Sequence, residues 1–286
     1  MNGPSFPGAV GVIGGGRMGA GIAHAFLLAG ADVTILEQDA DAATSALTRL
    51  HDAVRTSVDR GSSSETEEML VRRAAVATRV ERLRHCDLVI EAVPEVPALK
   101  LDILKRVESE LATDAWLCSN TSSISIDLLA SSLARPERFC GLHFFNPVPS
   151  SSLIEIVPGE RTNPELIEHA RDWANQVGKT AIVVGNSPGF ASSRLGIIVA
   201  IEAMRMLEEG VATASDIDTA MVLGYRHPVG PLRLTDMVGL DVRLGIAEYL
   251  ASELGERFEP PGILRDKVAA GKLGRKTGEG FFTWST

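Results

Sequence analysis

The sequence predicts an α/β protein with two domains: a doubly wound, mostly parallel sheet followed by an all-helical C-terminal domain. From residue 9 to about 184, short β-branched runs alternate with longer helical stretches, the pattern of a parallel sheet covered by helices. After Asn186, a turn with the letters SPG leads into helical periodicity that continues to the end. With 286 residues and 45% hydrophobic content, the chain has enough apolar material for two cores. We therefore predict domains at 1–186 and 187–286.

The first domain contains seven or eight strand candidates. The clearest runs are 9–13, 32–36, 88–91, 116–119, 139–144, 153–157 and 180–184. Helices such as 98–111 and 164–177 lie between them. The polar letters GSSSET at 61–66 interrupt an Arg- and Glu-rich helical region. This break predicts a projecting helical hairpin over about 41–75, a candidate lid or partner surface.

Charge, hydropathy and cysteine content limit the classes of partner. The formal net charge of −9 argues against nucleic acid or an anionic membrane, because binding to either needs clustered Lys and Arg. No apolar run reaches the roughly 18 residues of a membrane span, and the first letters, MNGPSFPGAV, do not resemble a signal peptide. The three cysteines are expected to be buried thiols with no metal bound. We expect a cytoplasmic protein that acts on a small molecule.

A glycine-rich turn directly follows the first strand candidate. Gly14, Gly16 and Gly19 make a G-x-G-x-x-G pattern, with Arg17 and Met18 between the last two glycines at the start of a helix. Glycines at these positions permit a tight turn, a close approach of backbone to a pyrophosphate, and close packing of the helix on the strand. The anion then meets the helix N-terminus. We predict a Rossmann-type dinucleotide-binding domain in which all five residues contact the cofactor.

An acidic residue at the end of the second strand candidate selects the cofactor. Glu37 follows the run DVTIL, at the position where a carboxylate binds the adenine ribose hydroxyls. The same carboxylate would repel a 2′-phosphate. The sequence therefore predicts NAD rather than NADP.

One further segment carries a specific resemblance. The letters GLHFFNPVP at 141–149, followed by LIE at 153–155, resemble the catalytic segment of the L-3-hydroxyacyl-CoA dehydrogenase family. The stretches VGVIGGGRMGAGIA, DLVIEAVPE, CSNTSS, GPLRLTDMVGLD and GRKTGEGFF, and the PGF…R turn at 188–194, are similar to that family in the same order along nearly the whole chain. The resemblance implies an NAD-dependent dehydrogenase that pairs as a homodimer.

Two residues of this segment match the chemistry that alcohol oxidation requires. A base must take the hydroxyl proton while hydride leaves the carbon, and a neutral imidazole suits that task near pH 7. His143 is the candidate base. Glu155 lies on the next strand candidate, from which it can return beside the ring to orient it and stabilise the imidazolium. The resemblance implies the same roles.

The resemblance assigns further residues to the site. Ser122, in the letters CSNTSS, would hold the substrate oxygen; a serine-rich turn is also a usual helix cap, and we expect Ser122 or Ser123 to begin a helix at Ile124. The remaining cofactor contacts implied are Glu95, Lys100, Asn120 and Asn146.

The sequence departs from the family pattern in three places. Ser193 stands where the family's PGFxxNR turn carries an asparagine that completes the catalytic group, so we assign Ser193 an assisting role. Three serines, at 150–152, line the turn after the NP pair. In the hairpin, Asp52 and Thr56 occupy a stretch where relatives place lysines toward the phosphates of CoA.

These departures leave three functions open. The first is interconversion of a hydroxyl and a carbonyl on a short L-3-hydroxyacyl-CoA. The second keeps the dehydrogenase chemistry but uses a small polar substrate without CoA, such as a hydroxy acid, a carnitine-like alcohol or a ring aldehyde. The third is a dinucleotide-binding regulator without catalysis.

Overall fold

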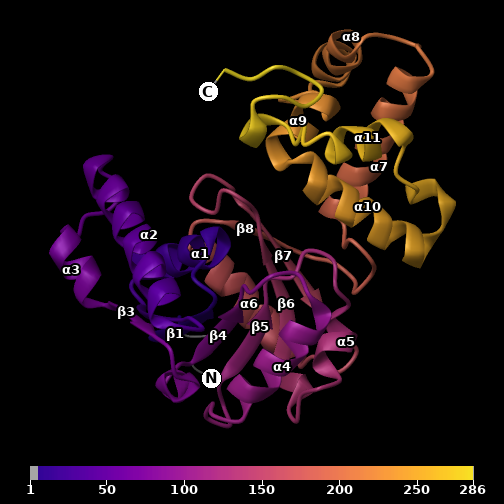
Figure 1. Cartoon of the computed structure of the whole chain (residues 1–286). Coiled ribbons are helices and arrows are strands. Elements are labelled where there is room, and N and C mark those ends of the chain that lie inside the picture. Colours follow the sequence, from indigo (N-terminus) through magenta and orange to yellow (C-terminus); the bar gives the residue numbers. More distant parts are fainter. Residues whose placement is uncertain (1–5, 286) are drawn as a thin grey trace. The chain divides into compact units, whose positions relative to one another are not determined.

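The computed structural model describes residues 6–285 and divides the chain into two compact units, Met1–Asn186 and Ser187–Thr286. The first unit is built around a sheet and the second around helices (Figure 1). The predicted fold class, a Rossmann-type sheet followed by a helical domain, is confirmed. Among the described residues, no helix has the length and apolarity needed to cross a bilayer.

The sheet of the first unit has eight strands in the order β3-β2-β1-β4-β5-β6-β7-β8. All neighbours pair in parallel except β6 and β7, which are antiparallel. The strands are β1 (Ala9–Ile13), β2 (Asp32–Leu36), β3 (Ala74–Ala77), β4 (Leu88–Glu91), β5 (Trp116–Ser119), β6 (Phe139–Phe144), β7 (Leu153–Pro158) and β8 (Thr180–Val183). The strand order reverses between β1 and β4, which is where open α/β sheets bind their ligands.

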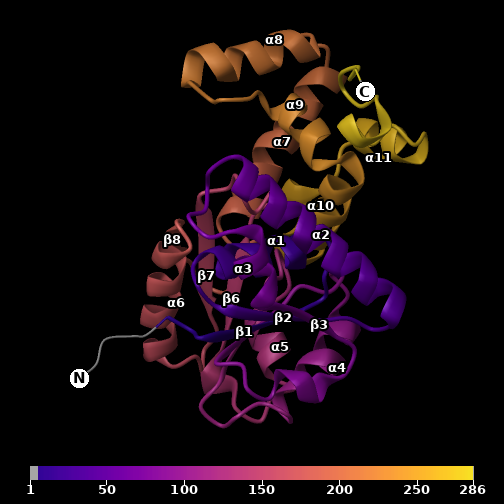
Figure 2. The same cartoon turned by 90° about the vertical axis from the view of Figure 1, so that its left-hand side faces the viewer.

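Helices cover both faces of this sheet, which explains why its central strands are apolar throughout (Figure 2). Their bounds are α1 (Arg17–Leu28), α2 (Ala40–Asp59), α3 (Glu67–Arg72), α4 (Pro97–Glu108), α5 (Ile126–Ala130) and α6 (Pro164–Gln176). Phe26 of α1, Leu50 of α2 and Trp173 of α6 join one apolar cluster with Val10 and Ile90 of the strands.

The region predicted as a projecting hairpin contains α2 and α3, which pack against each other. Asp39 caps α2 by accepting a hydrogen bond from the N–H of Ala42 at 2.8 Å. Leu50 and Val54 of α2 are fully buried in the core of the sheet. One boundary of the prediction is wrong, because residues 74 and 75 belong to strand β3. An alanine-rich run has little strand propensity of its own, and it becomes a strand by pairing with β2.

The second unit is helical. Its helices are α7 (Ser192–Glu208), α8 (Ala214–Thr219), α9 (Pro231–Val238), α10 (Leu240–Leu254) and α11 (Gly262–Ala269), with a π-helical turn at Ala220–Gly224. The buried carboxylate of Asp236 accepts hydrogen bonds from the N–H groups of Phe281 and Phe282 and from Nε1 of Trp284. This side chain therefore anchors the C-terminal segment to α9.

Candidate active site

His143 and Glu155 lie directly opposite one another on the antiparallel strands β6 and β7. Residues paired in this way project from the same face of a sheet, so their side chains meet. His143 Nδ1 is 2.8 Å from Glu155 Oε2, and both side chains are buried. The structure brings the predicted base and its predicted orienting carboxylate into direct contact.

This contact favours one tautomer of a neutral imidazole. An ionised carboxylate only accepts hydrogen bonds, so a neutral His143 beside an ionised Glu155 carries its proton on Nδ1. Nε2 of the same ring then carries the lone pair that accepts a proton. The ring of Phe145 packs against the imidazole, with 4.4 Å between ring centroids. His143 is thus held on one side by a carboxylate and on another by an aromatic ring.

The glycine turn between β1 and α1 has the geometry that a phosphate site needs. Gly14 has φ +90°, a conformation that favours glycine, and a Cβ on Gly19 would lie 1.7 Å from the carbonyl oxygen of Gly14. A side chain at Gly16, by contrast, would meet nothing within 4 Å. Gly16 is also the N-cap of α1 and provides no side-chain cap for the N–H groups of the first turn.

Glu37 lies beside this turn, at the end of β2. Its Oε1 accepts a hydrogen bond from the N–H of Gly15 at 2.5 Å, and Arg49 Nη1 donates to the carbonyl of Gly15 at 3.2 Å. Arg17 is exposed at the start of α1, and Met18 is half-buried against the core. An open helix N-terminus and an adjacent carboxylate together fit the pyrophosphate and the ribose hydroxyls of NAD.

The serine-rich turn after β5 is organised by Glu95. Its Oε1 accepts hydrogen bonds from the N–H groups of Ser122 and Ser123 at 2.9 and 3.2 Å, and from the Thr121 hydroxyl at 2.5 Å. The Ser122 hydroxyl lies farther away, at 3.3 Å. Burial acts to raise the pKa of Glu95, but the charge of Lys100 and these hydrogen bonds lower it overall. Glu95 is therefore an ionised carboxylate that shapes the loop carrying Ser122.

Helix α5, which follows this turn, begins later than expected. It starts at Ile126, and the side chain of Ser125 accepts the capping hydrogen bond from the N–H of Leu128. The expectation that Ser122 or Ser123 caps a helix at Ile124 is therefore wrong. Glu95 holds both of those serines in the turn, so neither side chain is at the helix end.

Two asparagines lie at the same edge of the sheet. Asn120 accepts a hydrogen bond from the N–H of Phe144 through Oδ1 at 2.8 Å, which ties the end of β5 to the end of β6. Asn146 is exposed two residues beyond Phe144. Both remain at the edge where the carboxyl ends of the parallel strands meet.

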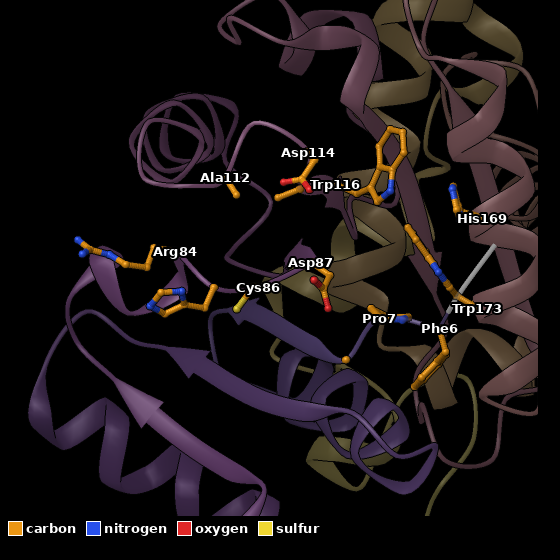
Figure 3. Close-up of a pocket in the computed structure, with 13 residues that line it drawn as sticks. Phe6, Pro7, Arg84, Cys86, Asp87, Ala112, Asp114, Trp116, His169 and Trp173 are labelled. Atoms are coloured by element: carbon orange, nitrogen blue, oxygen red, sulfur yellow. The ribbon is translucent and has the colours of Figure 1, made fainter. Parts of the chain in front are cut away.

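A pocket of about 430 Å³ lies at the opposite, amino-terminal edge of the strands (Figure 3). The residues that line it include Trp116, His169, Trp173, Asp87 and Asp114. It contains none of the predicted site residues. The candidate active site is thus the carboxyl edge of the sheet.

Family models match both units of the chain. The model of the 3-hydroxyacyl-CoA dehydrogenase NAD binding domain matches residues 9–187, and that of the C-terminal domain of the same family matches residues 189–284. The chain belongs to the 3-hydroxyacyl-CoA dehydrogenase family. It is an NAD-dependent oxidoreductase.

Individual relatives of this dehydrogenase agree over nearly its full length. A protein of Bradyrhizobium diazoefficiens named 3-hydroxybutyryl-CoA dehydrogenase is 38% identical over 96% of this chain and 94% of its own. One of Deinococcus radiodurans, named Probable 3-hydroxybutyryl-CoA dehydrogenase, is 38% identical over 96% and 99%. The crystal structure of (S)-3-hydroxybutyryl-CoA dehydrogenase from Ralstonia eutropha has a TM-score of 0.92 at 37% identity, with 98% of this chain and 100% of that chain covered.

Lys100 of this dehydrogenase is buried among protein partners. Its ammonium is 1% exposed and donates to Glu91 Oε1 at 2.6 Å and to the Val93 carbonyl at 3.1 Å, and it lies 3.2 Å from Glu95 Oε2. An ammonium has three N–H donors, so these partners occupy all of them. Lys100 therefore supports Glu95, which organises the serine-rich turn, from within the protein.

The buried residue Glu91 was missed by the sequence reasoning. It is fully buried at the end of β4, where it accepts hydrogen bonds from Lys100 and, at 2.5 Å, from the Ser119 hydroxyl. Burial raises the pKa of Glu91 despite these partners. The available signal was a glutamate ending an apolar strand, with a lysine on the helix that follows.

Ser193 belongs to the second unit, in the first turn of α7. It is half-buried, and its neighbour Arg194 donates to the Ser187 hydroxyl at 3.3 Å. The serine that replaces the family's asparagine therefore lies where a helix begins.

Proposed function

We propose that this dehydrogenase interconverts a short L-3-hydroxyacyl-CoA and the corresponding 3-oxoacyl-CoA. The observation that supports this most is the hydrogen-bonded pair of His143 and Glu155 at the carboxyl edge of an NAD-binding sheet. The names of the relatives, which specify 3-hydroxybutyryl-CoA, support a short acyl chain.

In the oxidation direction, Nε2 of His143 takes the proton of the C3 hydroxyl while the hydride leaves C3. NAD, when bound, supplies the hydride acceptor. The Glu155 carboxylate stabilises the imidazolium that forms, because it already accepts the Nδ1 hydrogen bond at 2.8 Å. In the reduction direction, the imidazolium returns the proton to the oxygen as hydride reaches C3.

For the cofactor, we propose that Gly14, Gly16 and Gly19 with Arg17 and Met18 form the pyrophosphate site. Glu37 would bind the adenine ribose, since its carboxylate is held against the same turn. Asn120, Asn146 and Glu95, together with Lys100 beside Glu95, would face the nicotinamide end from the carboxyl edge of the sheet.

For the substrate, we propose that the Ser122 hydroxyl holds the reacting oxygen and that Ser193 assists, as the asparagine does in relatives. The Ser122 hydroxyl makes the longest of the hydrogen bonds to Glu95, at 3.3 Å, while the backbone bonds hold the turn. The hydroxyl can therefore rotate toward a substrate oxygen without loss of the turn.

Purified protein should be tested with NADH and acetoacetyl-CoA, with a panel of CoA-free oxo acids and aldehydes run in parallel. Rapid loss of the NADH absorbance with the thioester, and none with the panel, is the expected result. Turnover of a CoA-free compound with no thioester activity would reject this substrate and favour the second candidate. The serines at 150–152 and Ser193 are the observations behind that second candidate, since they make the sequence more polar than the family pattern. Turnover of any of these compounds would also exclude a non-catalytic regulator.

We further propose that the protein is a homodimer through its second unit. Leu223 and Tyr225, in and just after the π-helical turn, are 76% and 77% exposed. Apolar side chains that project this far are typical of interfaces. Light scattering should give about twice the mass of one chain for the unmodified protein. The double variant Leu223→Glu/Tyr225→Glu should have the mass of a single chain. Met69→Glu, at an exposed residue of the first unit, is the control. A single-chain mass for the unmodified protein would reject the proposal.

We propose a cytoplasmic location. The three free cysteines support this, because free thiols are usual in a reducing compartment. Fractionation of the source cells, followed by an immunoblot, would test it.

A further inference from the structure

Lys179 is a buried lysine at the entrance to strand β8. It follows α6 after Gly178, which has φ +74°, and its residue is 7% exposed. Its ammonium donates hydrogen bonds to the carbonyl of Val148 at 2.6 Å and to that of Ser151 at 2.5 Å. Among the described residues no carboxylate forms an ion pair with it. Burial lowers the pKa of Lys179.

A buried ammonium without a carboxylate is unfavourable, so its contacts need explanation. An apolar side chain of the same length would fill this space without desolvating a charge. Lys179 differs from such a side chain by its charged N–H donors, which bind neutral carbonyls more strongly than a neutral donor would. Both carbonyls belong to a single loop, 145–152, so the lysine acts on that loop.

This loop connects the two catalytic strands. It leaves β6 just after His143 and enters β7 just before Glu155. On the side of the loop away from Lys179, the buried side chain of Val148, which is 2% exposed, packs against Gly21. A Cβ added to Gly21 would lie 2.9 Å from that side chain. Gly21 lies on α1, the helix whose N-terminus faces the cofactor. The loop is therefore held between α1 on one side and Lys179 on the other.

We infer that Lys179 is a positioning residue for hydride transfer: by binding the carbonyls of Val148 and Ser151, it sets the connection between β6 and β7 and so the alignment of His143 with Glu155. The expected effect on kcat rests on the proposed function, whereas the expected effect on the alignment of His143 with Glu155 does not. Because the loop also contacts α1, the same hydrogen bonds fix the catalytic strands relative to the helix that starts at the pyrophosphate turn.

Lys179→Met tests this inference, because methionine keeps an unbranched apolar stem and removes the N–H donors. We expect kcat to fall by about 10-fold to 100-fold, the effect of a small misalignment, while KM for NAD changes by less than about twofold. Lys179→Arg keeps a cationic donor and should recover part of the lost kcat. Leu70→Ala, at a fully buried residue of α3, is the control for lost stability, because it lies outside the loop and outside the site.

A second measurement does not depend on turnover. In the NAD-bound protein, the Nδ1 proton of His143 should give a downfield proton NMR resonance that is absent in His143→Gln. We expect this resonance to shift or broaden in Lys179→Met and to be unchanged in Leu70→Ala. If no thioester is turned over but the resonance responds as expected, the proposed function fails and the positioning role stands. If Lys179→Met lowers only the melting temperature, with kcat and the resonance as in Leu70→Ala, Lys179 is merely structural and the inference is overturned.

Discussion

Glu37 accepts a hydrogen bond from the N–H of Gly15 at 2.5 Å, which connects the carboxylate at the end of β2 directly to the glycine turn after β1. The residue proposed to select NAD is thereby held by the turn proposed to bind its pyrophosphate. A carboxylate fixed in this way cannot easily move aside for a 2′-phosphate.

Replacing Glu37 should therefore change cofactor selection. Glu37→Ala should weaken NAD binding about tenfold, the effect of a lost charged hydrogen bond, and reduce the discrimination against NADP. Isothermal titration with both dinucleotides measures this. Glu37→Gln keeps an acceptor for the Gly15 N–H and removes the charge, so it should restore NAD binding in part while still admitting NADP. Unchanged selectivity in both variants would reject the ribose role.

The glycine turn offers a matched pair of substitutions. Gly19→Ala would place a Cβ 1.7 Å from the carbonyl oxygen of Gly14, so it should distort the turn, lower the melting temperature and abolish NAD binding. Gly16→Ala adds a Cβ that meets no protein atom within 4 Å. It should leave the melting temperature unchanged and weaken NAD binding, because the methyl group points into the proposed phosphate site. Equal effects of both variants on melting would contradict this assignment.

His143→Ala should lower kcat by about two to four orders of magnitude and leave NAD affinity nearly unchanged. Glu155→Gln should lower kcat as well, because an amide cannot stabilise the imidazolium as a carboxylate does. Stopped-flow hydride transfer and a separate NAD titration distinguish the two properties. Loss of NAD binding in His143→Ala would show that the residue is not primarily a base.

His24 should make stability depend on pH. It is 3% exposed on α1, 3.0 Å from the Ser57 hydroxyl, and burial lowers its pKa below the ordinary value of 6.5. As pH falls below 6.5, the unfolded chain binds a proton at this residue before the folded chain does, so the free energy of unfolding decreases. The slope from one such group is at most about 1.4 kcal/mol per pH unit.

Urea unfolding of His24→Asn between pH 5 and 7 measures this contribution. The variant should have a shallower dependence on pH than the unmodified protein over that interval. His85→Asn, at an exposed histidine of the first unit, should retain the original slope. The same slope in all three proteins would exclude His24 as the source.

Much of the first unit follows from short-range patterns in the chain. The turn at 14–19 and its flanking strand and helix were predicted because glycine spacing and apolar periodicity are local properties. Strand β3 was not, since the alanines of 74–77 become a strand only through pairing with β2. The start of α5 was misplaced because Glu95, from a distant turn, holds the serines that would otherwise cap it.

By itself the sequence determined the fold class and the use of NAD, and it predicted His143 as the base, because each of these leaves a mark in residue type and spacing. Only the tertiary structure decided that Lys100 is enclosed by carboxylates and that Lys179 binds the carbonyls of Val148 and Ser151. A backbone carbonyl is present at every residue, so no letter in the sequence reveals which ones a lysine will bind. The physical reason is that such contacts depend on where folding brings distant segments, and the sequence reports only what each residue can do.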